Sequence, residues 1–147
     1  MSFISTMALL LIAFAVISCT GQSFAGSFCG TTANNVLTLN FTFPNPSGYF
    51  GNATFSMIDF QSETFPGCPA EEYQYTPANS VTTSTPVPLG QITFASMTTT
   101  TGCMATQLQL MWITGFTITA LGATYNASEA ESMIFQAGAY SMPLNRC

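Results

Sequence analysis

The stretch NVLTLNFTF, residues 35–43, alternates between apolar and polar side chains. Its apolar members occupy every second position: Leu37, Leu39, Phe41 and Phe43. Because successive side chains of a β-strand point to opposite faces, this period predicts a strand with one buried and one polar face. Such a strand needs neighbours that cover its apolar face, so the stretch predicts a chain that folds as a sheet.

The same period recurs along the chain between clusters of turn-forming residues. Further alternating segments lie at residues 51–57, 91–97, 106–113, 116–121, 132–136 and 140–144. The cluster PNPSG at 44–48 predicts a hairpin between the first two strands. We therefore expect an all-β fold: a single small antiparallel sandwich or closed barrel of about seven to nine short strands.

Two segments in the second half of the chain are also expected to be extended. Threonine is β-branched and favours extended backbone, so the four threonines at 98–101 predict an exposed edge or the approach to a β-turn. The stretch TQLQLMWI at 106–113 places Leu108, Leu110 and Trp112 on one face of a strand.

The beginning of the chain has the pattern of a secretory leader. Residues 7–17 form an uncharged apolar run of signal-peptide length, which is too short to span a bilayer. Ser23 and Ala25 then match the small-x-small pattern that precedes a signal cleavage site. We expect residues 1–25 to be removed by cleavage after Ala25, which leaves residues 26–147 as a single all-β domain.

An alternative interpretation of the leader is a bacterial lipobox at residues 16–19, with Cys19 carrying the lipid. Lipoprotein leaders rely on Lys or Arg, and this leader contains neither. Cleavage after Ala25 is therefore the preferred interpretation.

Removal of the leader leaves an even number of cysteines, which are Cys29, Cys68, Cys103 and Cys147. In an exported chain an even set predicts disulfides, here two, and we expect a secreted, extracellular protein. Three connectivities are open. Pairing of Cys29 with Cys147 and of Cys68 with Cys103 is favoured, because the ends of a domain often lie close together. The spacings do not fit a zinc site, and the chain has no histidine to complete one.

Three N-x-S/T sequons, at Asn40, Asn52 and Asn126, predict N-glycosylation. Asn40 and Asn52 are both out of phase with the apolar residues of their strands, so both fall on the polar face of the hairpin. If Asn40 lies opposite Asn52, their Cβ atoms are only about 5 Å apart. Two glycans would crowd at that distance, so we expect either poor occupancy of one site or a register displaced by two residues.

Charged side chains make up 5% of the chain, and its net charge is −5. Arg146 is the single basic side chain, and there is no lysine or histidine. Nucleic-acid binding depends on several Lys and Arg contacts to phosphates, so a nucleic-acid partner is excluded. Catalytic triads need histidine as a base and Schiff-base chemistry needs lysine, so these mechanisms are excluded too.

Carboxylates are the remaining candidates for acid–base chemistry. Asp59 with Glu63, and Glu71 with Glu72, are close in sequence, and paired carboxylates hydrolyse glycosides in many enzymes. The second pair would also suit calcium. Both pairs fall in or beside expected loops, so we interpret them as solvated surface charge and predict no catalytic, metal or cofactor site.

Taken together, these features predict a secreted, glycosylated extracellular protein without catalytic activity, serving as a binding or surface-coat protein. Its partner is unknown, and neither a nucleic acid nor a membrane span is expected. The alternative is a carrier of a small apolar ligand. The chain contains 13 Phe and 5 Tyr, and such residues can line a pocket inside a β-barrel or simply fill its core.

Overall fold

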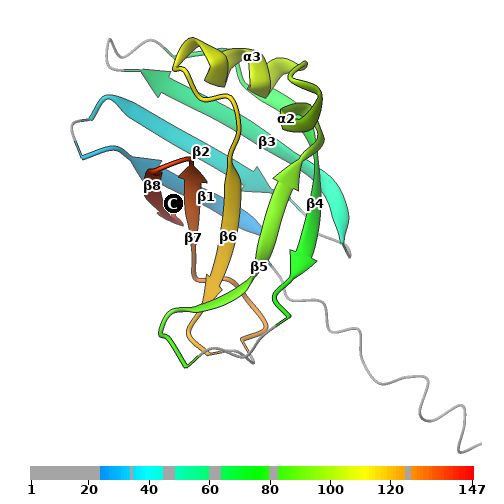
Figure 1. Cartoon of the computed structure of the whole chain (residues 1–147), viewed down its shortest axis with the longest axis vertical. Coiled ribbons are helices and arrows are strands. Elements are labelled where there is room, and N and C mark those ends of the chain that lie inside the picture. Colours follow the sequence, from blue (N-terminus) through cyan, green and yellow to red (C-terminus); the bar gives the residue numbers. More distant parts are fainter. Residues whose placement is uncertain (1–23, 34, 45–48, 60–63, 80–82, 125–126) are drawn as a thin grey trace, which may run out of the picture.

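The computed structural model describes residues 24–33, 35–44, 49–59, 64–79, 83–124 and 127–147. They form a closed barrel in which each antiparallel strand pairs with the next, and β1 pairs with β8 to close the ring (Figure 1). The strands are β1 (Gly26–Thr31), β2 (Leu37–Phe43), β3 (Phe50–Asp59), β4 (Cys68–Pro77), β5 (Val87–Phe94), β6 (Thr117–Gly122), β7 (Ser132–Ala137) and β8 (Tyr140–Arg146). The predicted all-β fold is confirmed, and of its two forms the barrel is the correct one. The predicted leader lies almost wholly outside the described residues.

The alternation of apolar and polar residues in the sequence matches the alternation of buried and outward-facing side chains in the structure. In β2 the residues at 37, 39, 41 and 43 are buried, and those between them are half-buried on the outer face. Leu39 faces Met57 and Phe41 faces Phe55 across the β2–β3 hairpin, so apolar side chains of neighbouring strands meet inside the barrel. The period therefore identified both the strands and the side that each one buries.

Aromatic rings fill the middle of the barrel. The ring centroid of Phe41 lies 5.1 Å from that of Phe55, 5.8 Å from Phe94, 6.1 Å from Phe116 and 6.4 Å from Phe135. Rings at these separations make favourable tilted contacts in addition to the area they bury. The centre of the interior is thus occupied by side chains of the protein itself.

A second aromatic cluster fills the end of the barrel opposite the helices. Its members are Phe24, Phe28, Phe43, Tyr73 and Tyr75. The ring of Tyr75 also covers Gly90, where a Cβ atom would approach the ring to 2.5 Å. Its hydroxyl donates a 2.8 Å hydrogen bond to the carbonyl oxygen of Leu89.

The burial of Tyr75 makes the stability of the barrel sensitive to alkaline pH. Desolvation, with a smaller effect of Tyr49, raises the pKa of Tyr75 to about 12. An unfolded tyrosine has a pKa of about 10, so the folded state holds the proton more tightly. We expect this stabilisation to be complete below about pH 10 and to disappear as the pH rises towards 12. Tyr75→Phe should weaken this pH dependence, which alkaline unfolding curves measure; equal curves for wild type and Tyr75→Phe would contradict the prediction.

Two short helices, α2 (Ala95–Thr99) and α3 (Cys103–Leu110), lie between β5 and β6 and cover one end of the barrel (Figure 1). The prediction of a strand at 106–113 was therefore wrong, and so was that of an exposed edge at 98–101: Thr98 and Thr99 belong to α2, and Thr100 caps it with left-handed backbone. The physical reason is that β5 pairs directly with β6, for example Ile92 with Ile118, which leaves the inserted segment without a strand partner. Among the described residues, no helix is long and apolar enough to cross a lipid bilayer.

The register of the β2–β3 hairpin differs from the expected one. Asn40 pairs with Ser56, and Asn52 pairs with Glu72 of β4, so the two asparagines are not opposite each other. The displacement amounts to four residues instead of two. It is an even number, so both asparagines keep the outer face, as the sequence predicted.

Candidate functional site: a groove at the helical end

A hollow among the described residues lies beside the helices and has a volume of about 980 Å3. Three segments line it: residues 31–33 with 36–37 from the β1–β2 connection, 111–115 after α3, and 137–138 with 140–143 from the β7–β8 turn. We call this hollow the Trp112 groove. It lies on the rim, apart from the aromatic rings that fill the centre of the barrel.

The hydrogen bonds that end α3 position Trp112 at the groove. The N–H of Trp112 donates to the carbonyl oxygen of Gln109, and the N–H of Ile113 donates to that of Leu108, each at 3.0 Å. This pair of bonds defines a Schellman motif, which places the residue after the helix cap in the left-handed region. Trp112 accordingly has φ 60°, a conformation that favours glycine.

Packing in the core does not explain why a tryptophan occupies this left-handed position. Its side chain is 93% exposed, although a left-handed backbone costs a residue with a side chain roughly 1–2 kcal/mol. Ile113, the next residue, is the one that is partly buried and packs against the core. A large exposed ring in a strained position is the pattern of a binding residue.

The rest of the groove combines apolar surface with hydroxyl groups and carries no charged side chain. Val36 and Tyr140 are exposed apolar side chains on its walls. The β1–β2 wall is fixed locally, because the hydroxyl of Thr32 accepts hydrogen bonds from the N–H groups of Val36 and Leu37 at 2.9 and 3.1 Å. The groove therefore suits an uncharged ligand that offers both apolar faces and hydroxyl groups.

All four cysteines of the predicted domain are paired, and the preferred connectivity is confirmed. Cys29 bonds to Cys147 and Cys68 bonds to Cys103. Two disulfides are characteristic of an oxidising compartment such as the extracellular space.

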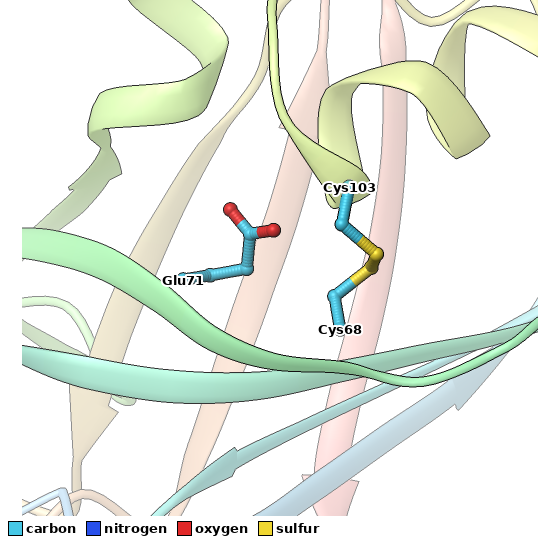
Figure 2. A group of neighbouring side chains, drawn as sticks. All are labelled: Cys68, Glu71 and Cys103. Atoms are coloured by element: carbon cyan, nitrogen blue, oxygen red, sulfur yellow. A yellow bond between two sulfur atoms is a disulfide. The ribbon is translucent and has the colours of Figure 1, made fainter.

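A second cluster lies at the start of α3, where Glu71 faces the disulfide between Cys68 and Cys103 (Figure 2). The ligand atoms of these three residues lie within 4.8 Å of one another, a spacing that would suit a metal ion. The sulfur atoms, however, are bonded to each other and offer no thiolate. Glu71 Oε1 instead accepts a 3.0 Å hydrogen bond from the N–H of Met104, which caps the helix from a neighbouring strand.

The structure corrects the interpretation of Glu71 as solvated loop charge. Glu71 lies within β4 and is only 6% exposed, whereas Glu72 is exposed on the outer face. Neighbouring strand residues point to opposite faces, so these two carboxylates do not converge on one calcium ion. Asp59 ends β3, and Glu63 lies outside the described residues.

Loss of the Glu71 carboxylate should destabilise the protein. Glu71→Ala leaves the buried N–H of Met104 without its acceptor, and we expect the free energy of unfolding to fall by about 1–3 kcal/mol. Glu72→Ala is the matched control, and a change within about 0.5 kcal/mol is expected at this exposed position. Urea denaturation of the two variants measures the difference; equal stabilities would contradict the capping role.

The predicted glycosylation sites lie on the outer surface where they are described. Asn40 is half-buried in the middle of β2, and Asn52 is exposed near the start of β3. Asn126 lies outside the described residues.

The sequence interpretation missed both Trp112 as a groove residue and Glu71 as a helix cap. A signal for α3 was present, because Met104, Ala105 and Leu108 have helical spacing and are buried. It competed with the period-two pattern of the same segment. No sequence signal links Glu71 to Met104, because the contact spans 33 residues.

Searches with protein-family models, among curated proteins and among solved structures each found no match to this chain. No relative therefore supplies a ligand, a partner or a catalytic residue for comparison.

Proposed function

We propose that this protein is a secreted, N-glycosylated extracellular binding protein without catalytic activity, and that the Trp112 groove is its contact surface. The observation that carries the proposal is Trp112 itself, a 93% exposed ring held at φ 60°. Tryptophan is enriched among residues that dominate binding energy, because one rigid side chain buries a large area.

The chemistry of the groove favours a neutral, hydroxyl-rich ligand, and a neutral oligosaccharide is the type we propose. The apolar face of a sugar ring can lie against the indole of Trp112. The hydroxyl groups of Thr31, Thr114 and Ser141 line the same groove and can exchange hydrogen bonds with sugar hydroxyls. The net charge of −5 and the absence of a cation in the lining both disfavour an acidic ligand.

The chain is suited to a direct test, because Trp112 is its only tryptophan. Its fluorescence therefore reports on the groove alone. We expect neutral oligosaccharides to shift the emission of the secreted protein to shorter wavelength as the indole leaves water, and acidic oligosaccharides to have no effect. Absence of a shift across a panel of neutral oligosaccharides would refute this ligand class.

A matched pair of variants separates binding from folding. Trp112→Gly should abolish oligosaccharide binding measured by calorimetry, without lowering the melting temperature, since glycine accepts the left-handed conformation. Leu110→Ala removes another exposed apolar side chain that does not line the groove, and it should bind like wild type. Loss of binding in both variants, or in neither, would contradict the assignment of the groove.

The register of the hairpin leads to a prediction about the glycans. Asn52 lies four residues along the sheet from the position opposite Asn40, a separation of roughly 13 Å at 3.3 Å per residue. Both sites can therefore carry glycans on the same molecule, and the exposed Asn52 should be the more fully occupied. Mass spectrometry of glycopeptides from the secreted protein measures both occupancies; glycosylation at only one of the two would contradict the prediction.

A further inference from the structure

Phe24 occupies the end of the barrel opposite the helices, and it precedes the first strand. Its side chain is 1% exposed. Its ring centroid lies 5.3 Å from that of Phe43, 5.6 Å from Tyr73 and 5.0 Å from Tyr75. Phe24 is thus enclosed by aromatic rings that belong to β2 and β4.

The residue after Phe24 is held by the only basic side chain of the protein. Arg146 Nη1 donates a 3.1 Å hydrogen bond to the carbonyl oxygen of Ala25. The guanidinium is fixed independently, because Nε and Nη2 donate to the carbonyl oxygen of Ala130 at 3.2 and 2.8 Å. It also lies 5.1 Å from the centre of the Phe28 ring, a cation–π contact.

Cleavage after Ala25 would remove both of these residues from the barrel. The space of Phe24 would be vacated, and Arg146 Nη1 would lose its acceptor. The new α-amino group at Gly26 would lie beside the guanidinium, since a Cβ atom on Gly26 would be 2.9 Å from Arg146 Nη1. Two positive groups would then face the mouth of an apolar space.

We propose that this vacated space is a binding site for a small aromatic carboxylate, with the ring in the place of Phe24 and the carboxylate on Arg146 and the Gly26 amine. The proposal rests on the export stated in the proposed function and on the cleavage after Ala25 that the sequence predicts. Phe24 and Ala25 stand in for the ligand here: the phenyl ring marks the apolar subsite, and the Ala25 carbonyl oxygen marks the position of a carboxylate oxygen. We call this space the Phe24 site.

The walls of the Phe24 site are held by contacts that do not involve Phe24. Tyr75 is anchored on the carbonyl oxygen of Leu89 at 2.8 Å. The ring of Tyr73 covers Gly51, where a Cβ atom would lie 2.5 Å from its hydroxyl oxygen. Phe43 belongs to β2 and pairs with Gly26. An apolar cavity with rigid walls can stay open and bind a benzene-sized ring, as cavities on the order of 150 Å3 do.

The charge at the mouth selects for an anion. Two neighbouring cations repel each other, and a ligand carboxylate relieves this repulsion while it forms charge-assisted hydrogen bonds. The phenyl ring alone would gain only the apolar contacts. A ligand with both groups, spaced as in a phenylalanyl-alanine dipeptide, should therefore bind best.

The test begins with the secreted full-length protein and its N-terminal residue, determined by intact mass. We expect the chain to begin at Gly26 and to bind N-acetyl-phenylalanyl-alanine in calorimetry. The corresponding C-terminal amide and N-acetyl-alanyl-alanine, which lack the charge and the ring respectively, should each bind at least about tenfold more weakly. At a dipeptide concentration about ten times the dissociation constant, the melting temperature should rise by about 5 °C.

Two variants make the result decisive. Phe24→Ala in the precursor should yield a secreted protein with the mass and melting temperature of wild type, because the changed residue is removed. Arg146→Lys keeps a positive charge without the planar guanidinium group. It should weaken binding of N-acetyl-phenylalanyl-alanine more than binding of the corresponding amide. A secreted chain that retains Phe24, or a chain beginning at Gly26 that does not distinguish the acid from the amide, would overturn the proposal.

The outcome is independent of the Trp112 groove, which lies at the opposite end of the barrel. Trp112→Gly should leave dipeptide binding unchanged. If oligosaccharides bind and the dipeptide does not, only the Phe24 site fails. If the dipeptide binds and oligosaccharides do not, only the proposed function of the groove fails.

Discussion

Replacement of both Cys29 and Cys147 by alanine should lower the free energy of unfolding by about 4–5 kcal/mol. The disulfide joins residues that are 118 positions apart, so its loss releases nearly the whole domain in the unfolded state. It also supports the weakest seam of the barrel, because β1 and β8 are matched over only two residue pairs. The measurement is chemical denaturation of the double variant without reducing agent.

The second disulfide provides the comparison for this prediction. Cys68 and Cys103 are 35 residues apart, and the same relation gives a loss about 1 kcal/mol smaller. This bond fastens α3 to β4 and does not close the barrel, so its removal should loosen the helical end first. Hydrogen exchange should rise at β1 and β8 in the first variant and at α2 and α3 in the second. A Cys29/Cys147 variant as stable as wild type would contradict the importance of the seam.

Phe41→Ala should lower the free energy of unfolding by about 4 kcal/mol, within the range for large-to-small changes in a packed core. Phe41 lies in the middle of the interior, and its ring is in contact with the rings of Phe55, Phe94, Phe116 and Phe135. These neighbours belong to separate strands or to the segment before β6, so they cannot all move into the vacated space. The loss therefore includes both the transfer energy of the ring and a residual cavity.

Phe50→Ala is the control for Phe41→Ala. Phe50 starts the neighbouring strand β3, but its side chain is 65% exposed, and we expect a loss below about 0.5 kcal/mol. Thermal and urea denaturation of both variants test the pair. A loss of less than about 1 kcal/mol for Phe41→Ala would mean that the core repacks freely, contrary to the close ring contacts.

The fold was predictable to the extent that it depends on local pattern. Period-two alternation located β2 and β3 and the side that each buries, because the pleat of a strand imposes that period on every residue. The cysteine pairing was also predicted, since the first and last cysteines lie near the ends of one domain. The helices were not, because 106–113 has an apolar pattern that fits either a strand or a helix face.

The candidate site depended on contacts that no local pattern encodes. Trp112 alternates with Leu110 in the sequence, yet it follows a helix and is fixed by bonds from Trp112 and Ile113 to α3. Glu71 is adjacent to Glu72 in the sequence, yet only Glu71 is buried against the helix. Both assignments required knowledge of which distant segments the fold brings together: the β1–β2 and β7–β8 connections beside Trp112, and α3 beside Glu71.

The sequence by itself determined that this chain forms strands with apolar inner faces, that its four domain cysteines pair, and that histidine- and lysine-dependent chemistry is absent. These properties follow from composition and from a period that each strand carries within itself. Only the tertiary structure decided that the sheet closes into a barrel, which residues face each other across it, and that helices and an exposed tryptophan shape one end. Closure and register depend on hydrogen bonds and packing between distant segments, and the energy of such contacts belongs to pairs of segments instead of to either one alone.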